Sequence, residues 1–471
     1  MSIFEGLRPE ATLRYFEEIC AIPHGSGDTK RISDYCVRFA QTQGLRYVQD
    51  GSNNVVIYKP AAAGYEDHPT VILQGHLDMV CEKDADCDID FSVDGLRLKH
   101  DGEYIFAEGT TLGGDDGIAV AYALAVLADK ELKHPALEAV FTVDEETGML
   151  GADAMDMSIL QGRRLINCDS EDEGVLTVSC AGGAKSELRL PLCREAAEGK
   201  VWRVGVEKLT GGHSGVEINR GRANANKVLA EILKNLPVRL ISMEGGSKDN
   251  AIPRACTAYV LAEDLKEAFF AATEEIKKTL PATETEAEFF CAEASCDGVP
   301  LTESSSKAFL GLLNDLPNGV QAMSEDIEGL VQTSLNLGIL KTAEDCARMT
   351  FSVRSSVNSE KADLIKKLRT VGERYGASYS QSGEYPAWEY RKDSPLREVM
   401  VSAFEELYGR KPVVEAIHAG LECGIFSDRL PGLDAVSFGP QMHDIHTSRE
   451  RLSLASVERT WDYLCRVLEK L

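Results

Sequence analysis

Short apolar runs alternate with helical segments over the first 180 residues, and this pattern limits the fold more than any other feature. Four runs are nearly continuous in apolar residues: Asn54–Tyr58, Thr70–Leu73, Ala139–Val143 and Arg164–Asn167. Strands buried on both faces of a mostly parallel sheet have this pattern. The strongly apolar segment Gly117–Asp129 predicts a helix packed on that sheet. The sequence therefore predicts an α/β fold, a mixed and mostly parallel sheet with helices on both faces.

The pattern changes at Gly182-Gly183 and returns after Trp388. Between them, amphipathic strands such as SELRLPL alternate with polar helices such as KADLIKKLRTVGERYG. The chain has 471 residues, whereas single hydrophobic cores stop growing at about 250–300 residues. We therefore predict two domains, one formed by residues 1–184 and 388–471 and the other an α+β domain inserted at 185–387. Two similar rounds of strands and helices predict an internal duplication in the inserted domain.

Composition excludes several classes of protein. The formal net charge of −26 argues against a nucleic-acid partner, because phosphate binding needs a basic surface. No apolar run reaches the roughly 18 residues that span a membrane, and the amino-terminal segment is amphipathic and carries acids. The 13 cysteines include no Cys-x-x-Cys pair, which is typical of a cytoplasmic protein without a disulfide framework. The negative charge is either a solubility surface or, in part, a set of carboxylates that hold divalent cations.

Five segments place acids and histidines at the ends of predicted strands, where open α/β sheets build their sites. In VILQGHLDMV, His76 and Asp78 are two residues apart and point to the same side of an extended strand. A neighbouring carboxylate often orients a histidine that ligates a metal. In TTLGGDDG, two acids precede the apolar helix. A helix N-cap needs only one of them, for which Asp116 is suited, so Asp115 is left as a candidate ligand.

The other three segments are FTVDEETGMLG, LINCDSE and FGPQMHDIHTSRERL. The first has three consecutive acids, which repel one another unless a cation lies among them; the alternative is an exposed acidic turn. In the second, Asp169 ends an apolar strand, and the third contains His443, His446 and Glu450. Carboxylates combined with imidazoles suit Zn²⁺ or Mn²⁺ rather than a thiolate zinc site.

In this order, the five segments resemble the co-catalytic zinc peptidase family that includes carnosinases, tripeptidase T and the aminoacyl-histidine dipeptidases. Three further segments add to the resemblance, which covers essentially the whole chain: GGHSGVEINRGRANANK, GGSKDNAIPR and HAGLECGIF. The resemblance implies a metal-dependent dipeptidase of broad or Xaa-His specificity. It also implies a zinc-peptidase catalytic domain in residues 1–184 and 388–471 and a lid domain in residues 185–387.

The resemblance implies two divalent metal ions, with Zn²⁺ as first choice and Mn²⁺ or Co²⁺ as alternatives. Asp115 matches the carboxylate that bridges both ions, in a cis peptide with Asp116. His443 competes with His446 for one ligand position, but the family's ligand stands four residues before a glutamate, as His446 does before Glu450. The remaining matches to metal ligands are His76 and Asp169 for one ion, and Glu146 and His446 for the other.

Further roles follow from the same resemblance. Glu145 matches the general base that acts with a metal-bridging hydroxide, and Asp78 matches the partner of His76. His213 matches a residue that stabilises the oxyanion, although a turn in its glycine-rich loop is the simpler interpretation. The candidates for binding small peptide substrates are Arg354, Asn250 and Glu422.

Several alternatives stay open. A tripeptidase or an N-acyl amino acid deacylase of the same family would carry similar motifs. A protein that only binds peptides or metals is an alternative of another class, against which the intact Glu145-Glu146 pair argues. The sequence does not choose between a monomer and a homodimer.

Overall fold

The computed structural model describes residues 2–471, which form two compact units. Unit 1 comprises residues 2–179, Tyr390–Ala416 and Leu421–Leu471, and unit 2 comprises Cys180–Glu389 and Ile417–Gly420. The predicted boundaries lie within a few residues of these limits, but the short segment 417–420 had no signal in the sequence. The roles of catalytic domain and lid domain, and the internal duplication, stay predictions.

Unit 1 is built on an eight-stranded sheet with the order β1-β2-β6-β3-β7-β21-β8-β20. Its four central strands are parallel: β6 (Leu137–Thr142), β3 (Val71–His76), β7 (Arg164–Asn167) and β21 (Asp434–Ser437). Antiparallel pairs flank these strands: β1 (Arg46–Gln49) pairs with β2 (Val55–Lys59), β2 with β6, and β8 (Val175–Cys180) with β21. Strand β20 (Val413–Ile417) forms one edge. The predicted mixed, mostly parallel sheet is confirmed, and its parallel strands lie at the centre.

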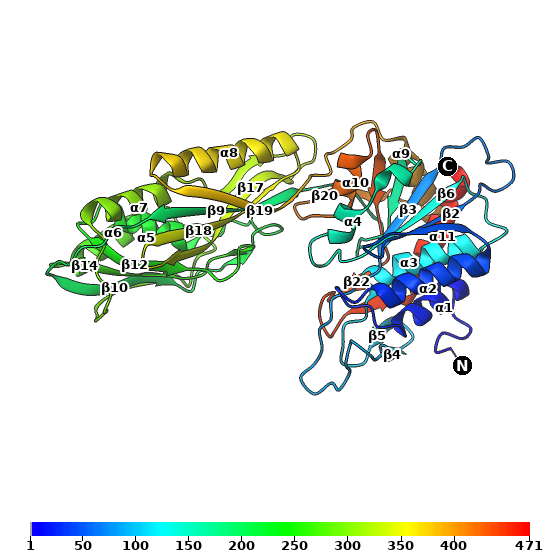
Figure 1. Cartoon of the computed structure of the whole chain (residues 1–471), viewed down its shortest axis with the longest axis horizontal. Coiled ribbons are helices and arrows are strands. Elements are labelled where there is room, and N and C mark those ends of the chain that lie inside the picture. The colour runs from blue at the N-terminus through cyan, green and yellow to red at the C-terminus, as the bar shows by residue number, and fades with distance from the viewer. Residues whose placement is uncertain (1) are drawn as a thin grey trace. The chain divides into compact units, whose positions relative to one another are not determined.

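Seven α-helices accompany this sheet in the described part of unit 1 (Figure 1): α1 (Glu10–Cys20), α2 (Lys30–Gln43), α3 (Gly114–Ala128), α4 (Leu150–Ala154), α9 (Pro395–Tyr408), α10 (Cys423–Arg429) and α11 (Leu454–Lys470). Helix α3 is apolar on all sides and buried, as expected for a helix that lies between a sheet and another helix. Helix α1 is that covering helix, and it packs along α3.

Adjacent residues of β3 contact helices on opposite faces of the sheet. A Cβ atom on Gly75 would lie 2.6 Å from Asp116 Oδ2, so α3 approaches too closely for a larger side chain. The Nε2 atom of Gln74 donates instead to Glu422 Oε2, 2.6 Å away and just before α10. Because successive side chains of a strand point to opposite faces, α3 and α10 cover different faces. This confirms the predicted helices on both faces.

A small second sheet in unit 1 joins two distant parts of the chain. Its order is β22 (Met442–His443), β23 (Arg451–Ser453), β5 (Tyr104–Ala107) and β4 (Leu98–His100). Pairing of β23 with β5 brings the carboxyl-terminal segment that holds His446 next to the segment that leads to Asp115.

Unit 2 is an antiparallel sheet covered by helices. The strand order is β15-β10-β14-β12-β17-β18-β9-β19, with β16 paired to β17. The strands are β9 (Gly182–Pro191), β10 (Lys200–Glu207), β12 (Arg239–Gly245), β14 (Cys256–Ala262), β15 (Glu288–Glu293), β16 (Gly319–Met323), β17 (Val331–Thr342), β18 (Cys346–Ser355) and β19 (Ser378–Tyr385). A separate short pair consists of β11 (Gly212–His213) and β13 (Ala251–Ile252).

The core of unit 2 lies between its sheet and four helices, α5 (Ala225–Leu233), α6 (Lys266–Lys277), α7 (Glu303–Asp315) and α8 (Asn358–Arg374). On β18, the residues Ala347, Met349, Phe351 and Val353 belong to this core together with residues of the helices. Since side chains alternate along a strand, Arg354 points to the opposite face of the sheet.

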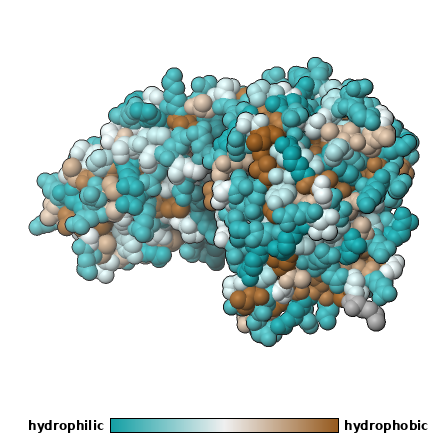
Figure 2. Space-filling model, turned by 45° about the vertical axis from the view of Figure 1, so that its right-hand side comes forward, coloured by the Kyte–Doolittle hydropathy of each residue, from teal (hydrophilic) through white to brown (hydrophobic). Residues whose placement is uncertain are grey.

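The surface carries many polar side chains, as expected from the 27% of charged residues in the chain. The face drawn in Figure 2 is mostly hydrophilic, with apolar side chains scattered over it. Within residues 2–471, no helix is both long and apolar enough to cross a membrane.

Candidate metal centre

Three parallel strands of unit 1 end side by side at one edge of the sheet. His76, the last residue of β3, is in register with Thr142, the last residue of β6. Gln74 is in register with Asn167, the last residue of β7. The acidic segments that follow β6 and β7 therefore begin at the same edge as His76, where open α/β sheets form their sites.

The carboxylate of Asp115 lies between two imidazoles. Its Oδ1 is 3.1 Å from His76 Nε2, and its Oδ2 is 3.0 Å from His446 Nε2. Glu146 Oε1 lies 2.8 Å from the same His446 nitrogen. The peptide bond between Asp115 and Asp116 is cis, as the resemblance implies. One oxygen directed to each imidazole is the arrangement expected of a carboxylate that two metal ions share.

Three groups of side chains each place their ligand atoms within 4.8 Å of one another. All five predicted ligands fall in these groups, and so do Asp116 and Glu145, for which the sequence predicted other roles. The division of ligands between two ions stays a prediction. The groups are His76, Asp116 and Asp169; His76, Glu145 and Glu146; and Asp115, Glu146 and His446.

Asp116 does not cap the helix that follows it, so this expectation was wrong. Asp115 and Asp116 have non-helical backbone angles at the start of α3, and the buried Oδ1 atom of Asp116 accepts no hydrogen bond from residues 2–471. The Oδ2 atom of Asp116 accepts a hydrogen bond from the backbone N–H of His76 at 3.1 Å. Its side chain is directed back to β3, where it fixes the end of the strand.

The carboxylates of the centre are buried next to one another, which favours a bound cation. Burial raises the pKa of Glu145 to about 8, and the nearby carboxylates of Glu422, Glu146 and Asp115 add to the rise. Burial also raises the pKa of Asp169, with further contributions from neighbouring acids. Divalent cations stabilise the ionised forms of such groups. The donors in the three groups are carboxylate oxygens and imidazole nitrogens, so the residues fit two divalent ions.

Asp78 holds the loop that carries Glu145 and Glu146. Strand β3 ends at His76, so Asp78 lies beyond the strand and not on it as the spacing predicted. Its carboxylate accepts hydrogen bonds from the N–H groups of Glu145 at 3.0 Å and Glu146 at 3.3 Å, and from the Ser26 hydroxyl at 2.7 Å. The Nδ1 atom of His76 lies 2.9 Å from the backbone oxygen of Asp78 and 3.5 Å from its Oδ1. Ser26 carried no signal in the sequence, since its role depends on this long-range contact.

Glu422 lies at the start of α10 against the sheet of unit 1, and its role in substrate binding stays a prediction. Its side chain is fully buried. The Oε2 atom accepts hydrogen bonds from Gln74 Nε2 and Thr142 Oγ1, both at 2.6 Å. Glu422 therefore links the start of α10 to β3 and β6.

The structure also separates His443 from His446. His443 belongs to β22 and its ring contacts Tyr104 edge-on, with 5.8 Å between centroids. Among residues 2–471, His446 belongs to a candidate ligand group and His443 does not. This geometry supports the choice of His446.

His213 lies in unit 2 with a defined orientation of its ring. Its Nδ1 accepts hydrogen bonds from the N–H groups of Gly215 at 3.2 Å and Val216 at 3.3 Å. Burial and the charge of Arg354 lower the pKa of His213, which keeps the ring neutral. A neutral imidazole that accepts at Nδ1 carries its proton on Nε2, so His213 presents a donor at Nε2.

Arg354 is a half-buried cation on the helix-free face of the unit 2 sheet. Its Nη1 donates to the Tyr385 hydroxyl at 3.3 Å, while its buried Nε has no hydrogen-bond partner among residues 2–471. His418, from the HAGLECGIF segment, lies near this charge, because Arg354 contributes to lowering the pKa of His418. A guanidinium with unused donors can bind a carboxylate.

Asn250 supports the loop of His213 through its backbone. Its carbonyl oxygen accepts a hydrogen bond from the N–H of Ser214 at 2.8 Å, and the next residue, Ala251, pairs with His213. The side chain of Asn250 is exposed, and its predicted contact with substrate stays a prediction.

We expect His418 to make the folded chain less stable as the pH falls. Its Nε2 is 2.7 Å from Ser334 Oγ, and burial, with Arg354 nearby, lowers its pKa to about 3. The unfolded chain binds a proton at this imidazole below about pH 6.5 but the folded chain does not, so protonation favours unfolding. The free energy of unfolding should fall by about 2 kcal/mol between pH 7 and pH 5 from this group.

Urea unfolding at pH 7 and pH 5, followed by circular dichroism, measures this effect. The His418→Gln variant should lose less stability between the two pH values than the wild type. Equal pH dependence in the two proteins would contradict the assignment.

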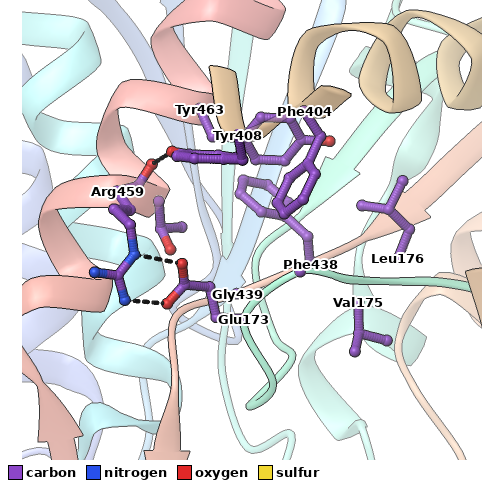
Figure 3. Close-up of a pocket in the computed structure, with 11 residues that line it drawn as sticks. Glu173, Val175, Leu176, Phe404, Tyr408, Phe438, Gly439, Arg459 and Tyr463 are labelled. Atoms are coloured by element: carbon purple, nitrogen blue, oxygen red, sulfur yellow. Dashed lines mark hydrogen bonds and ion pairs between the residues drawn. The ribbon is translucent and has the colours of Figure 1, made fainter. Parts of the chain in front are cut away.

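A small cavity elsewhere in unit 1 is a packing feature. It measures about 10 Å³, room for about one water molecule. Figure 3 shows Phe404, Tyr408, Phe438 and Tyr463 around it, with the Arg459–Glu173 ion pair at one side. The cavity is too small for a peptide.

Comparison with known proteins gives one consistent result. Residues 72–470 match the family model described as Peptidase family M20/M25/M40. The chain is 37% identical over 482 residues to the cytosol non-specific dipeptidase of Escherichia coli (strain K12), across 100% of this chain and 99% of that protein. The crystal structure of aminoacylhistidine dipeptidase from Vibrio alginolyticus matches with a TM-score of 0.95 and 38% identity, over 99% of this chain and 98% of that one. The aminopeptidase PepT from Bacillus cereus ATCC 10987 shares the fold, with a TM-score of 0.59, 15% identity and coverage of 98% and 99%.

Proposed function

The chain belongs to peptidase family M20/M25/M40, and we propose that it is a cytosolic dipeptidase that works with two divalent metal ions. Two relatives that match it over nearly their whole length are named as dipeptidases. The observation that carries the proposal is the carboxylate of Asp115, which lies between His76 and His446 with Glu146 beside it. Zn²⁺ is our first choice of metal, with Mn²⁺ and Co²⁺ as alternatives.

Glu145 is the proposed general base. Two divalent ions, when bound, lower the pKa of a coordinated water and polarise the scissile carbonyl. Glu145 then accepts the proton of the attacking water and donates it to the leaving amine. Asp78 supports this role because it accepts a hydrogen bond from the Glu145 N–H and so fixes the loop.

His213 is the proposed donor to the oxygen that becomes negative during the attack. Two backbone N–H groups bind its Nδ1, which leaves the protonated Nε2 for the substrate. Such a donor is fixed before the reaction and needs no rearrangement as charge develops.

Arg354 is proposed to bind the free carboxylate of the substrate. Replacing it with lysine keeps the charge but removes the planar pair of donors. A hydrogen bond to a charged group contributes about 1.5–3 kcal/mol, so we expect kcat/KM for a dipeptide to fall by about 10–100-fold, mainly through KM. Steady-state kinetics measure this change.

Arg348 supplies a matched control for that substitution. It lies on the same strand and the same face as Arg354, but it is exposed. Arg348→Lys should leave both constants near those of the wild type. If both lysine variants behave like the wild type, Arg354 does not bind the substrate carboxylate.

A substrate profile tests the proposed function. Purified protein loaded with Zn²⁺ is assayed with Ala-His, β-Ala-His, a tripeptide and an N-acetyl amino acid. We expect hydrolysis of the dipeptides, and the relative rates distinguish broad from Xaa-His specificity. Hydrolysis of only the tripeptide or only the N-acetyl amino acid would replace the proposal with a tripeptidase or a deacylase. No hydrolysis of any of them would favour a binding protein.

A further inference from the structure

Glu450 binds the backbone of four consecutive residues at the metal centre. Its Oε2 accepts hydrogen bonds from the N–H groups of Leu112 at 2.7 Å and Gly113 at 3.1 Å. Its Oε1 accepts from Gly114 at 2.8 Å and Asp115 at 3.3 Å. The side chain is almost fully buried, with 2% of its surface exposed. All four bonds therefore lie in a region that water does not reach.

The glycines of this loop allow the carboxylate to approach. Gly113 has a positive φ of 65°, which glycine adopts without strain. A Cβ atom on Gly114 would lie only 3.1 Å from Glu450 Oε1. The loop and Glu450 thus form one hydrogen-bonded structure, in which a buried carboxylate accepts from four N–H groups that point toward it.

The backbone of Glu450 belongs to the segment that carries His446. The N–H of Glu450 donates to the Thr447 carbonyl at 3.1 Å, which closes the turn directly after His446. Strand β23 begins with the next residue and pairs with β5. One residue thus holds Asp115 through its side chain and the His446 turn through its main chain.

We propose that Glu450 is a positioning residue that sets the spacing between Asp115 and His446 and thereby the affinity for the metal ions. Its carboxylate touches no reacting atom in this role and acts through the two ligands. The inference rests on the proposed two-metal centre, but it does not depend on which peptide is cleaved.

The variant Glu450→Gln tests this role. The amide keeps the length of the side chain but places an NH₂ group against one pair of N–H donors. The loop must then shift, and the carboxylate of Asp115 shifts with it. We expect the metal-free variant to bind two Co²⁺ or Zn²⁺ ions still, with the affinity of at least one step lowered by about 10–100-fold, the range found when outer partners of metal ligands are removed.

Two readouts that need no substrate measure the change. Calorimetric titration of the metal-free protein gives stoichiometry and affinity, and the visible absorption of bound Co²⁺ reports the ligand geometry. Glu138→Gln is the matched control, because Glu138 is also a buried carboxylate that accepts N–H groups, those of Gln161 and Gly162. Glu138 lies near the amino end of β6, away from the edge that holds His76.

The outcomes separate the alternatives. Weaker metal binding and an altered Co²⁺ spectrum in Glu450→Gln, but not in Glu138→Gln, support the proposal. The proposal is overturned if Glu450→Gln binds metal with the affinity and Co²⁺ spectrum of the wild type, or if both variants lose the same affinity. A wild-type protein that binds no metal also overturns it. If Glu450→Gln does not fold, Glu450→Asp is measured in the same way; if neither folds, Glu450 acts through the fold and the proposal fails. A wild type that binds two ions but cleaves no dipeptide refutes the proposed function and leaves this test intact.

Discussion

Glu145→Gln should remove nearly all dipeptide hydrolysis while leaving about two metal ions per chain. Glutamine has almost the same shape but cannot accept a proton from water, and a general base contributes about 10²–10⁴-fold to the rate. The Asp78 bonds to the loop involve backbone N–H groups, which the substitution keeps. The loss should therefore appear in kcat. Steady-state kinetics and elemental analysis of the same sample measure both quantities.

The exposed Glu131 provides a control of the same chemistry, and Glu131→Gln should keep wild-type activity. A Glu145→Gln variant with wild-type kcat would refute the role as base. A variant that loses its metal as well as its activity would show that Glu145 acts as a ligand, as its place in one candidate ligand group allows.

Asp115→Asn should weaken both metal sites together. The amide has one oxygen and no charge, so it cannot offer an anionic oxygen to each ion as the carboxylate does between His76 and His446. We expect metal affinity to fall by more than the roughly 10–100-fold typical of outer partners, and activity to fall with it. Titration of the metal-free protein, together with the dipeptide assay at increasing metal concentration, measures the change.

Asp67→Asn, at an exposed position, controls for the loss of one negative charge. It should bind metal as the wild type does. If Asp115→Asn lost the affinity of one ion only, Asp115 would be a ligand of that ion and not shared by two.

Much of the fold could be predicted because local patterns determine it. The run Arg164–Asn167 is β7 without change, and the predicted helix Gly117–Asp129 corresponds to α3, which ends one residue earlier, at Ala128. Strand β3 extends further than predicted, to His76, because Gln74 and Gly75 are buried inside the layers. A polar residue and a glycine give no apolar signal, so only their contacts with α10 and α3 explain the longer strand.

The residues of the candidate centre could be named from the motifs, but their contacts could not. The bonds between Glu450 and the loop at Leu112–Asp115 join positions more than 300 residues apart in the chain. The resemblance predicts a substrate-binding role for Glu422, but it does not predict the burial of this side chain or its bonds with Gln74 and Thr142. Sequence spacing carries no information on such partners.

A crystal structure with anomalous scattering data at the zinc edge tests the central claim most directly. The protein is crystallised after loading with Zn²⁺, and the anomalous map locates each ion independently of the chain. We predict two peaks, one bounded by His76, Asp115 and Asp169 and the other by Asp115, Glu146 and His446. A single peak, or peaks that Asp115 does not share, would contradict the two-metal centre.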